Sequence, residues 1–171
     1  MSRHLALALI ASVGLAGAAH AFDNEPDGFR GIPFGASIAD YESELLKQNE
    51  RPTGEVVYVR RSDKMSIGEA KLDQLQYVFY KGRFYGARIG TSGQDNKFAL
   101  IRTFDAQFGR GDRPNRYLDE YFWRGARAHI LISCPPARAR HICAAQIASR
   151  ELMNEATEDR KRAAERSGSD F

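Results

Sequence analysis

Runs of apolar residues interrupted by polar turn residues occupy the middle of the chain, which is the pattern of β-strands. The clearest stretches are residues 75–80 and 83–89, which are rich in aromatic and β-branched residues and are separated by a Lys-Gly pair. Such a turn between two such stretches is typical of a β-hairpin. The hairpin would place Phe79 opposite Phe84.

Other stretches have the same residue types. Residues 56–59 are β-branched and aromatic, residues 117–123 and 126–134 read as a second hairpin, and residues 142–148 as a returning strand. Together with the first hairpin they predict an antiparallel sheet of five or six strands.

Two segments carry apolar residues at helical spacing. A Ser-x-x-Asp capping pattern begins at Ser37 and predicts a helix that runs to about residue 49. Asp95 or Asn96 would cap a second helix, which ends before Gly109. Both helices are expected to pack on one face of the sheet.

Charged residues dominate the end of the chain. Ser149 can cap a helix over residues 150–166, whose apolar stripe is thin. The predicted fold is therefore α+β: a single domain at residues 29–149, with a charged C-terminal helix and tail at residues 150–171. A tandem α-β-β-β repeat is an alternative, because residues 79–82 and 122–125 are alike, but the match is short and an unduplicated domain is favoured.

The first 21 residues have the layout of a cleavable Sec-type signal peptide. Arg3 and His4 form a short basic region, residues 5–15 an apolar core, and Ala19-His20-Ala21 the cleavage site. The core is shorter than the roughly 20 residues of a membrane-spanning helix. Since Ala18 stands where a lipoprotein needs a cysteine, the sequence predicts an unlipidated protein without a transmembrane segment.

Cleavage at this site would leave Phe22 as the first residue of a periplasmic or secreted protein, with residues 22–28 as a flexible leader. The whole chain has a net charge of +3, of which Arg3 contributes one. Basic and acidic residues are interleaved, which is the pattern of an ordinary solvated surface. Nucleic-acid binding is therefore not expected.

Cys134 and Cys143 are the only cysteines, and in an oxidising compartment they predict a disulfide. Closing a loop of this length contributes about 2.5 to 3 kcal/mol. The bridge would hold Arg138, Arg140 and His141 in a preorganised tip that suits an acidic partner. The alternative is a stiffened hairpin whose arginines are merely solvated.

Two further chemistries use residues of the same region. Cys134, His141 and Cys143 could hold zinc or copper, but their spacing matches no strong metal motif, so no metal or other cofactor is expected. His129 could serve a hydrolase with Ser133, yet four residues of strand separate the two. A hydrogen-bonded structural histidine is the favoured interpretation, and an enzyme is the less favoured class.

Aromatic residues could form an exposed binding face, for which Tyr85 and Trp123 are the leading candidates. The alternative is that they pack beneath the helices.

Residues 29–35 and 77–84 resemble segments of small secreted bacterial proteins of no assigned activity. The chain is also similar to small envelope modules of the BamE and beta-lactamase-inhibitor type, which pack helices on an antiparallel sheet and bind proteins. The resemblance implies a compact α+β domain and carries over no functional residue.

These observations favour a non-catalytic, secreted or periplasmic binding or accessory module of the bacterial envelope that recognises a protein or an acidic surface. A small periplasmic hydrolase using His129 and a metal-binding protein using the cysteine loop are the alternatives.

Overall fold

The computed structural model describes residues 22–135 and 142–168. The predicted signal peptide and the loop with Arg138, Arg140 and His141 lie outside these residues. The strands are β1 (Gly28–Phe29), β2 (Ile32–Pro33), β3 (Leu45–Glu50), β4 (Glu55–Arg60), β5 (Ser66–Ile67), β6 (Ala70–Lys71), β7 (Gln74–Tyr80), β8 (Arg83–Thr91), β9 (Glu120–Arg124), β10 (Ala128–Ser133) and β11 (Cys143–Ser149); the helices are the 3-10 helix η1 (Ile38–Tyr41), α1 (Gln94–Phe108) and α2 (Arg150–Gly168). None of the described helices is long and apolar enough to cross a membrane.

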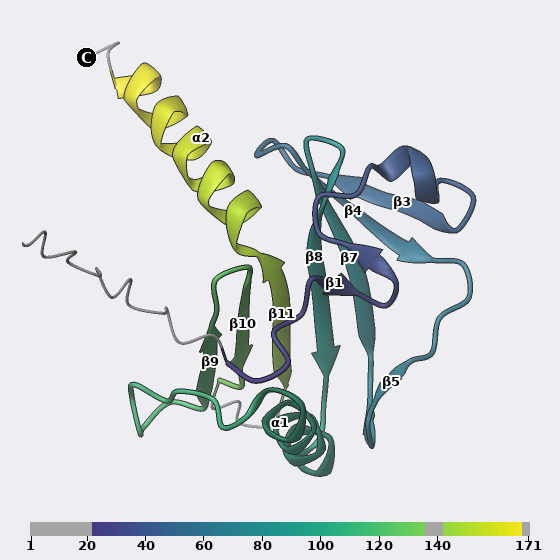
Figure 1. Cartoon of the computed structure of the whole chain (residues 1–171), viewed down its shortest axis with the longest axis vertical. Helices are drawn as coiled ribbons and strands as arrows, with labels where there is room; N and C mark the ends of the chain where they lie inside the picture. Colours follow the sequence, from purple (N-terminus) through teal and green to yellow (C-terminus); the bar gives the residue numbers. More distant parts are fainter. Residues whose placement is uncertain (1–21, 136–141, 169–171) are drawn as a thin grey trace, which may run out of the picture.

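A seven-stranded antiparallel sheet in the order β3-β4-β7-β8-β11-β10-β9 forms the body of the molecule (Figure 1). The predicted α+β class is confirmed, with more strands than the five or six expected. The β7–β8 hairpin pairs Phe79 with Phe84 as predicted. Gly86 is required at the centre, because a Cβ there would lie 2.0 Å from the Ile147 carbonyl oxygen of β11.

The two long helices cover opposite faces of the sheet. On the α1 face, Leu100 and Phe104 of α1 pack in one core cluster with Tyr77, Phe79 and Phe84 of the central hairpin. On the α2 face, a smaller cluster joins Leu152 and Ala156 of α2 to the hairpin and β11. The two helices expected on one face are not both present, because η1 and β3 occupy the place of the first one. The C-terminal helix, expected at the edge, packs as α2 on the face opposite α1, since consecutive residues of β7 are buried on alternate sides.

The helix expected from Ser37 to residue 49 is also wrong. Ser37 caps the short η1, its hydroxyl accepting a hydrogen bond from Ala39 N at 3.3 Å. The chain then turns into β3, which pairs with β4 through contacts such as Leu46 opposite Val59. Pairing with β3 gives hydrogen-bond partners to the backbone groups along the outer edge of β4. The free energy gained by this pairing outweighs the weak helix preference of residues 45–50.

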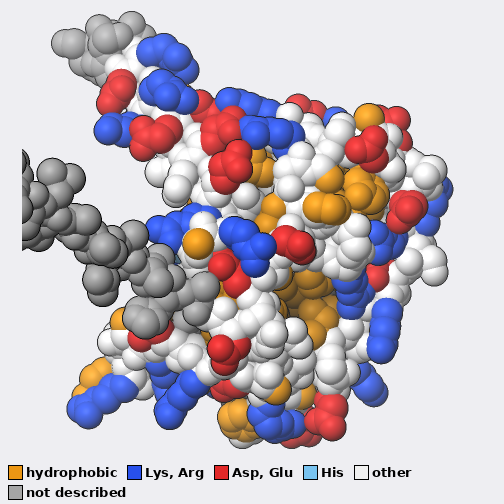
Figure 2. Space-filling view, viewed as in Figure 1, with side chains coloured by type: hydrophobic (Ala, Val, Ile, Leu, Met, Phe, Trp, Pro, Cys, Tyr) orange, Lys and Arg blue, Asp and Glu red, His pale blue; other side chains and the backbone are white. Residues whose placement is uncertain are grey.

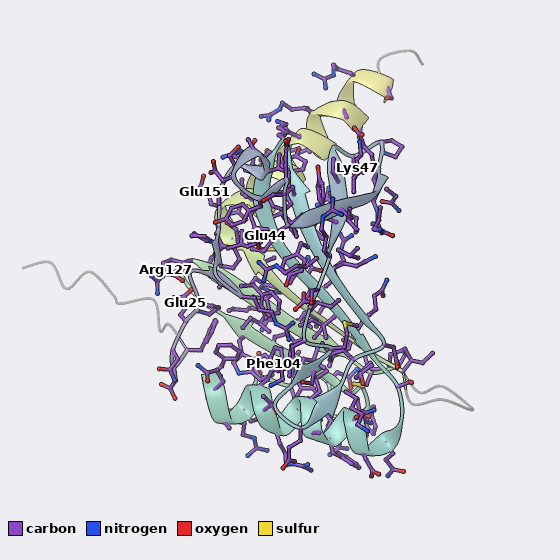
Figure 3. All side chains as sticks on the ribbon, turned by 90° about the vertical axis from the view of Figure 1, so that its right-hand side faces the viewer. Glu25, Glu44, Lys47, Phe104, Arg127 and Glu151 are labelled. Atoms are coloured by element: carbon purple, nitrogen blue, oxygen red, sulfur yellow. A yellow bond between two sulfur atoms is a disulfide. The ribbon has the colours of Figure 1, made fainter. Side chains whose placement is uncertain are left out.

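Residues 22–28, expected to be a flexible leader, instead form an N-terminal strap that is fastened to the fold (Figure 3). The Glu25 carboxylate accepts hydrogen bonds from the backbone N–H of Arg127 at 2.6 Å and of Ala128 at 2.7 Å. The Phe22 ring meets the edge of Phe108 with centroids 5.7 Å apart. The strap thereby becomes one wall of the α1 face.

Apart from the edge strand β3, which has no counterpart, the strand order is symmetric about the β8–β11 pair, with β7 and β4 on one side and β10 and β9 on the other. A tandem duplication would give this symmetry. In the first half, however, only η1 stands where the second half has α1, so the duplication stays a prediction.

Candidate functional site

The predicted disulfide between Cys134 and Cys143 is present and joins the end of β10 to the start of β11. Both cysteines are buried. Because a disulfide leaves no thiolate to bind a metal, the metal-site alternative loses two of its three ligands. Among residues 22–135 and 142–168, no group of three or more His, Cys, Asp or Glu side chains could hold a metal ion.

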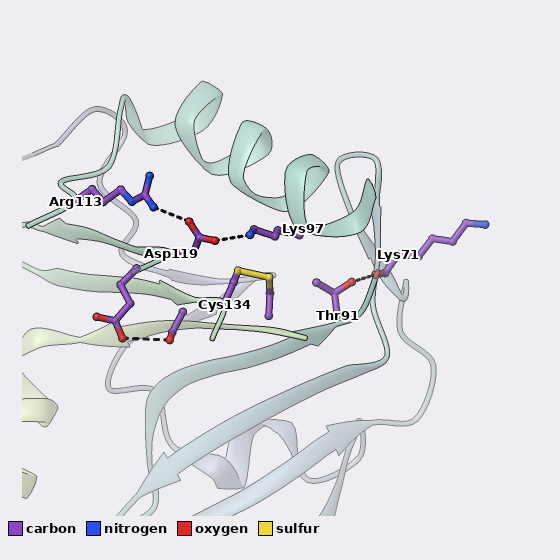
Figure 4. The surroundings of a disulfide bond; sticks show 9 residues. Lys71, Thr91, Lys97, Arg113, Asp119 and Cys134 are labelled. Atoms are coloured by element: carbon purple, nitrogen blue, oxygen red, sulfur yellow. Dashed lines mark hydrogen bonds and ion pairs between the residues drawn. A yellow bond between two sulfur atoms is a disulfide. The ribbon is translucent and has the colours of Figure 1, made fainter. Parts of the chain in front are cut away.

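Asp119 organises the surroundings of this disulfide (Figure 4). Its carboxylate accepts hydrogen bonds from Lys97 Nζ at 2.5 Å and from Arg113 Nη2 at 2.7 Å. Its carbonyl oxygen accepts a hydrogen bond from Cys134 N at 2.8 Å. Asp119 therefore ties the loop before β9 to the start of α1 and to the disulfide. We call the region formed by these three segments the disulfide end.

Exposed apolar side chains gather in the segments of the disulfide end. The described chain has six large hydrophobic side chains that are exposed, and four of them belong to these segments: Phe98, Tyr117, Leu118 and Ile142. Arg116 lies against the Tyr117 ring at 4.9 Å and donates a hydrogen bond to its hydroxyl. Apolar and cationic groups thus occur together at this end.

The aromatic binding residues expected from the sequence are both buried, so that expectation is corrected. Tyr85 is 6% exposed and lies under α2, and Trp123 is 2% exposed and lies on the α1 face. The Trp123 indole N–H donates to the Gly109 carbonyl oxygen at 2.7 Å. Neither ring is open to a partner, because each helix covers the sheet face on which its ring stands.

His129 lies half-buried on the α2 face of β10, and its ring makes no hydrogen bond to the part of the chain that the structure describes, so the hydrogen bond expected for it is not found. Its ring meets the Phe122 ring with centroids 6.3 Å apart. Burial, and then the positive charges of Arg124 and Arg150, lower the pKa of His129. Ser133 is directed to Glu120, to which its hydroxyl donates at 3.3 Å, so the structure does not assemble the hydrolase constellation.

A pocket of about 730 Å³ opens on the α1 face, and sequence analysis did not anticipate it. Figure 2 shows a hollow on this side with hydrophobic side chains at its floor. The N-terminal strap, the β5 segment and α1 form its walls, and its apolar lining consists of Pro26, Phe29, Ile67, Phe104, Phe108 and Ile147. We call it the strap pocket.

Arg30 and Asp63 close one side of the strap pocket with an ion pair. Arg30 also donates to the carbonyl oxygens of Lys64 and Ser66, each at 2.7 Å. Asp63 accepts a further hydrogen bond from the Tyr77 hydroxyl at 2.6 Å, and burial, followed by this bond, raises the pKa of Tyr77. These polar groups satisfy one another, so the pocket offers a ligand its apolar floor and the other polar side chains of its lining, among them Asp27 and Lys64.

Arg30 has a φ of 48°, in the left-handed region that non-glycine residues rarely adopt. It forms the two-residue turn between β1 and β2 with Gly31. An Arg-Gly pair flanked by apolar residues was visible in the sequence as a turn signal. The partners of Arg30 were not, because Asp63 lies 33 residues further along the chain.

Comparisons with protein-family models, with curated proteins and with solved structures each gave no match. The resemblance to small envelope modules therefore stays a prediction, and the geometry of the strap pocket and of the disulfide end carries the functional argument.

Proposed function

We propose that this chain is an exported, non-catalytic binding module of the bacterial envelope, and that it recognises a protein by taking an apolar side chain of that partner into the strap pocket. The observation that carries the proposal is the pocket itself, whose volume of about 730 Å³ and aromatic floor suit such a group. Binding energy in protein interfaces is concentrated in anchors of this kind.

Export is supported by the signal-like pattern of residues 1–21 and by the disulfide, since disulfides persist in oxidising compartments. The disulfide end favours an acidic partner. Lys97 and Arg113 share the single carboxylate of Asp119. Arg116 and exposed apolar side chains belong to the same segments. Arg138, Arg140 and His141 would add to this positive charge.

The test is crosslinking of the tagged mature protein in its native envelope, followed by mass spectrometry. Gln107 is exposed and lines the strap pocket, so Gln107→Trp places a large ring over the pocket mouth. Gln94→Trp is the matched control, because Gln94 is exposed on the same helix outside the pocket. A partner captured by the control and lost with Gln107→Trp supports the proposal. Equal capture by both variants contradicts it.

A second variant tests the acidic partner. Arg138→Ala combined with Arg140→Ala is expected to weaken capture of the same partner. The melting temperature should stay nearly unchanged, because exposed charges contribute little to stability. Unchanged capture would remove the acidic-surface part of the proposal and leave the strap pocket as its basis.

A further inference from the structure

A second concavity lies on the α2 face of the sheet, where strand register brings polar side chains together from four strands. One row across the sheet consists of Gln76 on β7, Arg88 on β8, Gln146 on β11 and Leu131 on β10. The neighbouring row consists of Gln74, Gly90, Ala144 and Ser133 on the same strands. Residues two apart on a strand share a face, so both rows point the same way.

The small residues of the second row form the floor of this concavity. Gly90 and Ala144 stand opposite each other at the centre, and longer side chains rise around them. The resulting hollow measures about 440 Å³ and is lined by residues of both rows together with Arg51 and Ile142. We call it the amide trough, because three glutamine carboxamides line it.

Positive charge is in excess at the amide trough. The buried Glu55 carboxylate accepts a hydrogen bond from Arg88 Nη2 at 2.6 Å and also pairs with Arg51 at 3.7 Å. Two guanidinium groups therefore share one carboxylate. Arg88 Nη1 is shielded from solvent and has no hydrogen-bond partner in the described structure. An unpaired donor of this kind is costly, and the positive charge of the guanidinium attracts an anionic group in the trough.

The carboxamides of the trough have free hydrogen-bonding capacity. The side chains of Gln74 and Gln76 make no hydrogen bond to any residue within 22–135 or 142–168. Gln146 stands opposite Arg88 on the neighbouring strand, in the same row. A carboxamide both donates and accepts hydrogen bonds, which matches the hydroxyl groups of a polyol.

From these features we propose that the amide trough binds a small carboxylated sugar of the hexuronic acid type. The carboxylate lies toward Arg88 and Arg51, where a negative charge balances the second guanidinium. The ring hydroxyls meet Gln74, Gln76 and Gln146. Leu131 and Ile142 supply the apolar surface on which the C–H face of a sugar ring rests. This site is separate from the strap pocket and does not depend on the function proposed for it.

Titration of the mature, disulfide-bonded protein with galacturonate, followed by two-dimensional NMR of the backbone amides, tests the proposal. Saturable shifts are expected at residues 88–90 and 144–146, with affinity for galactose at least about tenfold lower. Either the absence of saturable shifts or equal binding of galactose overturns the proposal. Acetate binding as tightly as galacturonate also overturns it, since the hydroxyl contacts would then contribute nothing.

Two substitutions locate the site without disturbing the part-buried Arg88–Glu55 pair. Ala144 is exposed on the trough floor, so Ala144→Phe should fill the trough and weaken galacturonate binding by more than about tenfold. Ala106→Phe, at an exposed position of α1, is the matched control and should leave the affinity unchanged. Gln76→Ala should weaken binding about fivefold, as expected for the loss of one hydrogen bond. Equal affinities of the Ala144→Phe and Ala106→Phe variants would place the ligand elsewhere.

Discussion

Glu25 shows how one residue can fasten a terminal segment. Its side chain is 5% exposed, and its carboxylate accepts hydrogen bonds from two successive backbone N–H groups before and at the start of β10. Gly125 makes room for it, because a Cβ at that position would lie 2.0 Å from Glu25 Oε1. The same strap forms a wall of the strap pocket, so this one carboxylate connects stability with the candidate site.

Replacement of Glu25 by alanine is expected to lower the free energy of unfolding by about 1.5 to 3 kcal/mol, because two charge-assisted hydrogen bonds are lost and the Ala128 N–H is left without its partner. Urea denaturation measures the change. Glu42→Ala, at an exposed position, should change stability by less than about 0.5 kcal/mol. If Glu25→Ala were as stable as Glu42→Ala, the strap would not be fastened through this carboxylate.

At the scale of elements, α2 is attached to the sheet by a small apolar contact and by ion pairs. Leu152 and Ala156 are buried against the central hairpin. Asp159 accepts hydrogen bonds from the Tyr80 hydroxyl at 2.6 Å and from Lys81 Nζ at 2.5 Å, and Glu155 pairs with Arg83. Beyond this contact the helix extends away from the sheet (Figure 1), which explains the thin apolar stripe of its sequence.

The attachment of α2 should weaken in acid. Hydrogen bonds lower the pKa of Asp159, and the largest contribution comes from Lys81. The pKa of Glu155 is lowered in the same way, chiefly by the hydrogen bond from Arg83. A carboxyl whose pKa is lower in the folded state stabilises that state fully at pH values above its unfolded pKa of about 4. This stabilisation is lost as the pH falls through the pKa of the folded state. The free energy of unfolding should therefore decrease below about pH 4.

The matched variant for this prediction is Glu155→Gln combined with Asp159→Asn. It should be less stable than the wild type at pH 7, and the difference should shrink toward pH 2 and in 1 M salt, which screens the ion pairs. Urea denaturation at several pH values measures both effects. A difference that is independent of pH and salt would show that the two carboxylates act only through packing.

At the scale of the whole molecule, one sheet serves two separate surfaces. The α1 face carries the main core and the strap pocket, and the α2 face carries the second cluster and the amide trough. The disulfide joins β10 and β11 at one end of this sheet. The core does not depend on it, because the buried side chains of both clusters come from eight strands and two helices.

Replacement of both Cys134 and Cys143 by alanine should therefore leave a folded protein that is about 2 to 3 kcal/mol less stable. Circular dichroism and urea denaturation check this. In the exported wild type, intact mass should correspond to a chain that begins at Phe22, and alkylation without reductant should label no thiol. Two labelled thiols would show that the bridge does not form in the cell.

Local pattern was sufficient for the β7–β8 hairpin, α1, the β10–β11 pair, α2 and the disulfide, because each is specified by periodicity, turn residues or spacing within a short segment. It was insufficient for residues 45–50, whose pairing with β4 decided their conformation. It also failed for Tyr85 and Trp123, since periodicity shows that one side of a strand is apolar but not what covers it.

The sequence by itself thus determined the fold class, the main strands and helices and the pairing of the cysteines. Only the tertiary structure decided which helix covers which face, that the N-terminal strap is docked, and where the cavities lie. The physical reason is that these features depend on contacts between residues far apart in the chain, such as Glu25 with Ala128 and Gln76 with Gln146 across Arg88, and no local pattern encodes such distances.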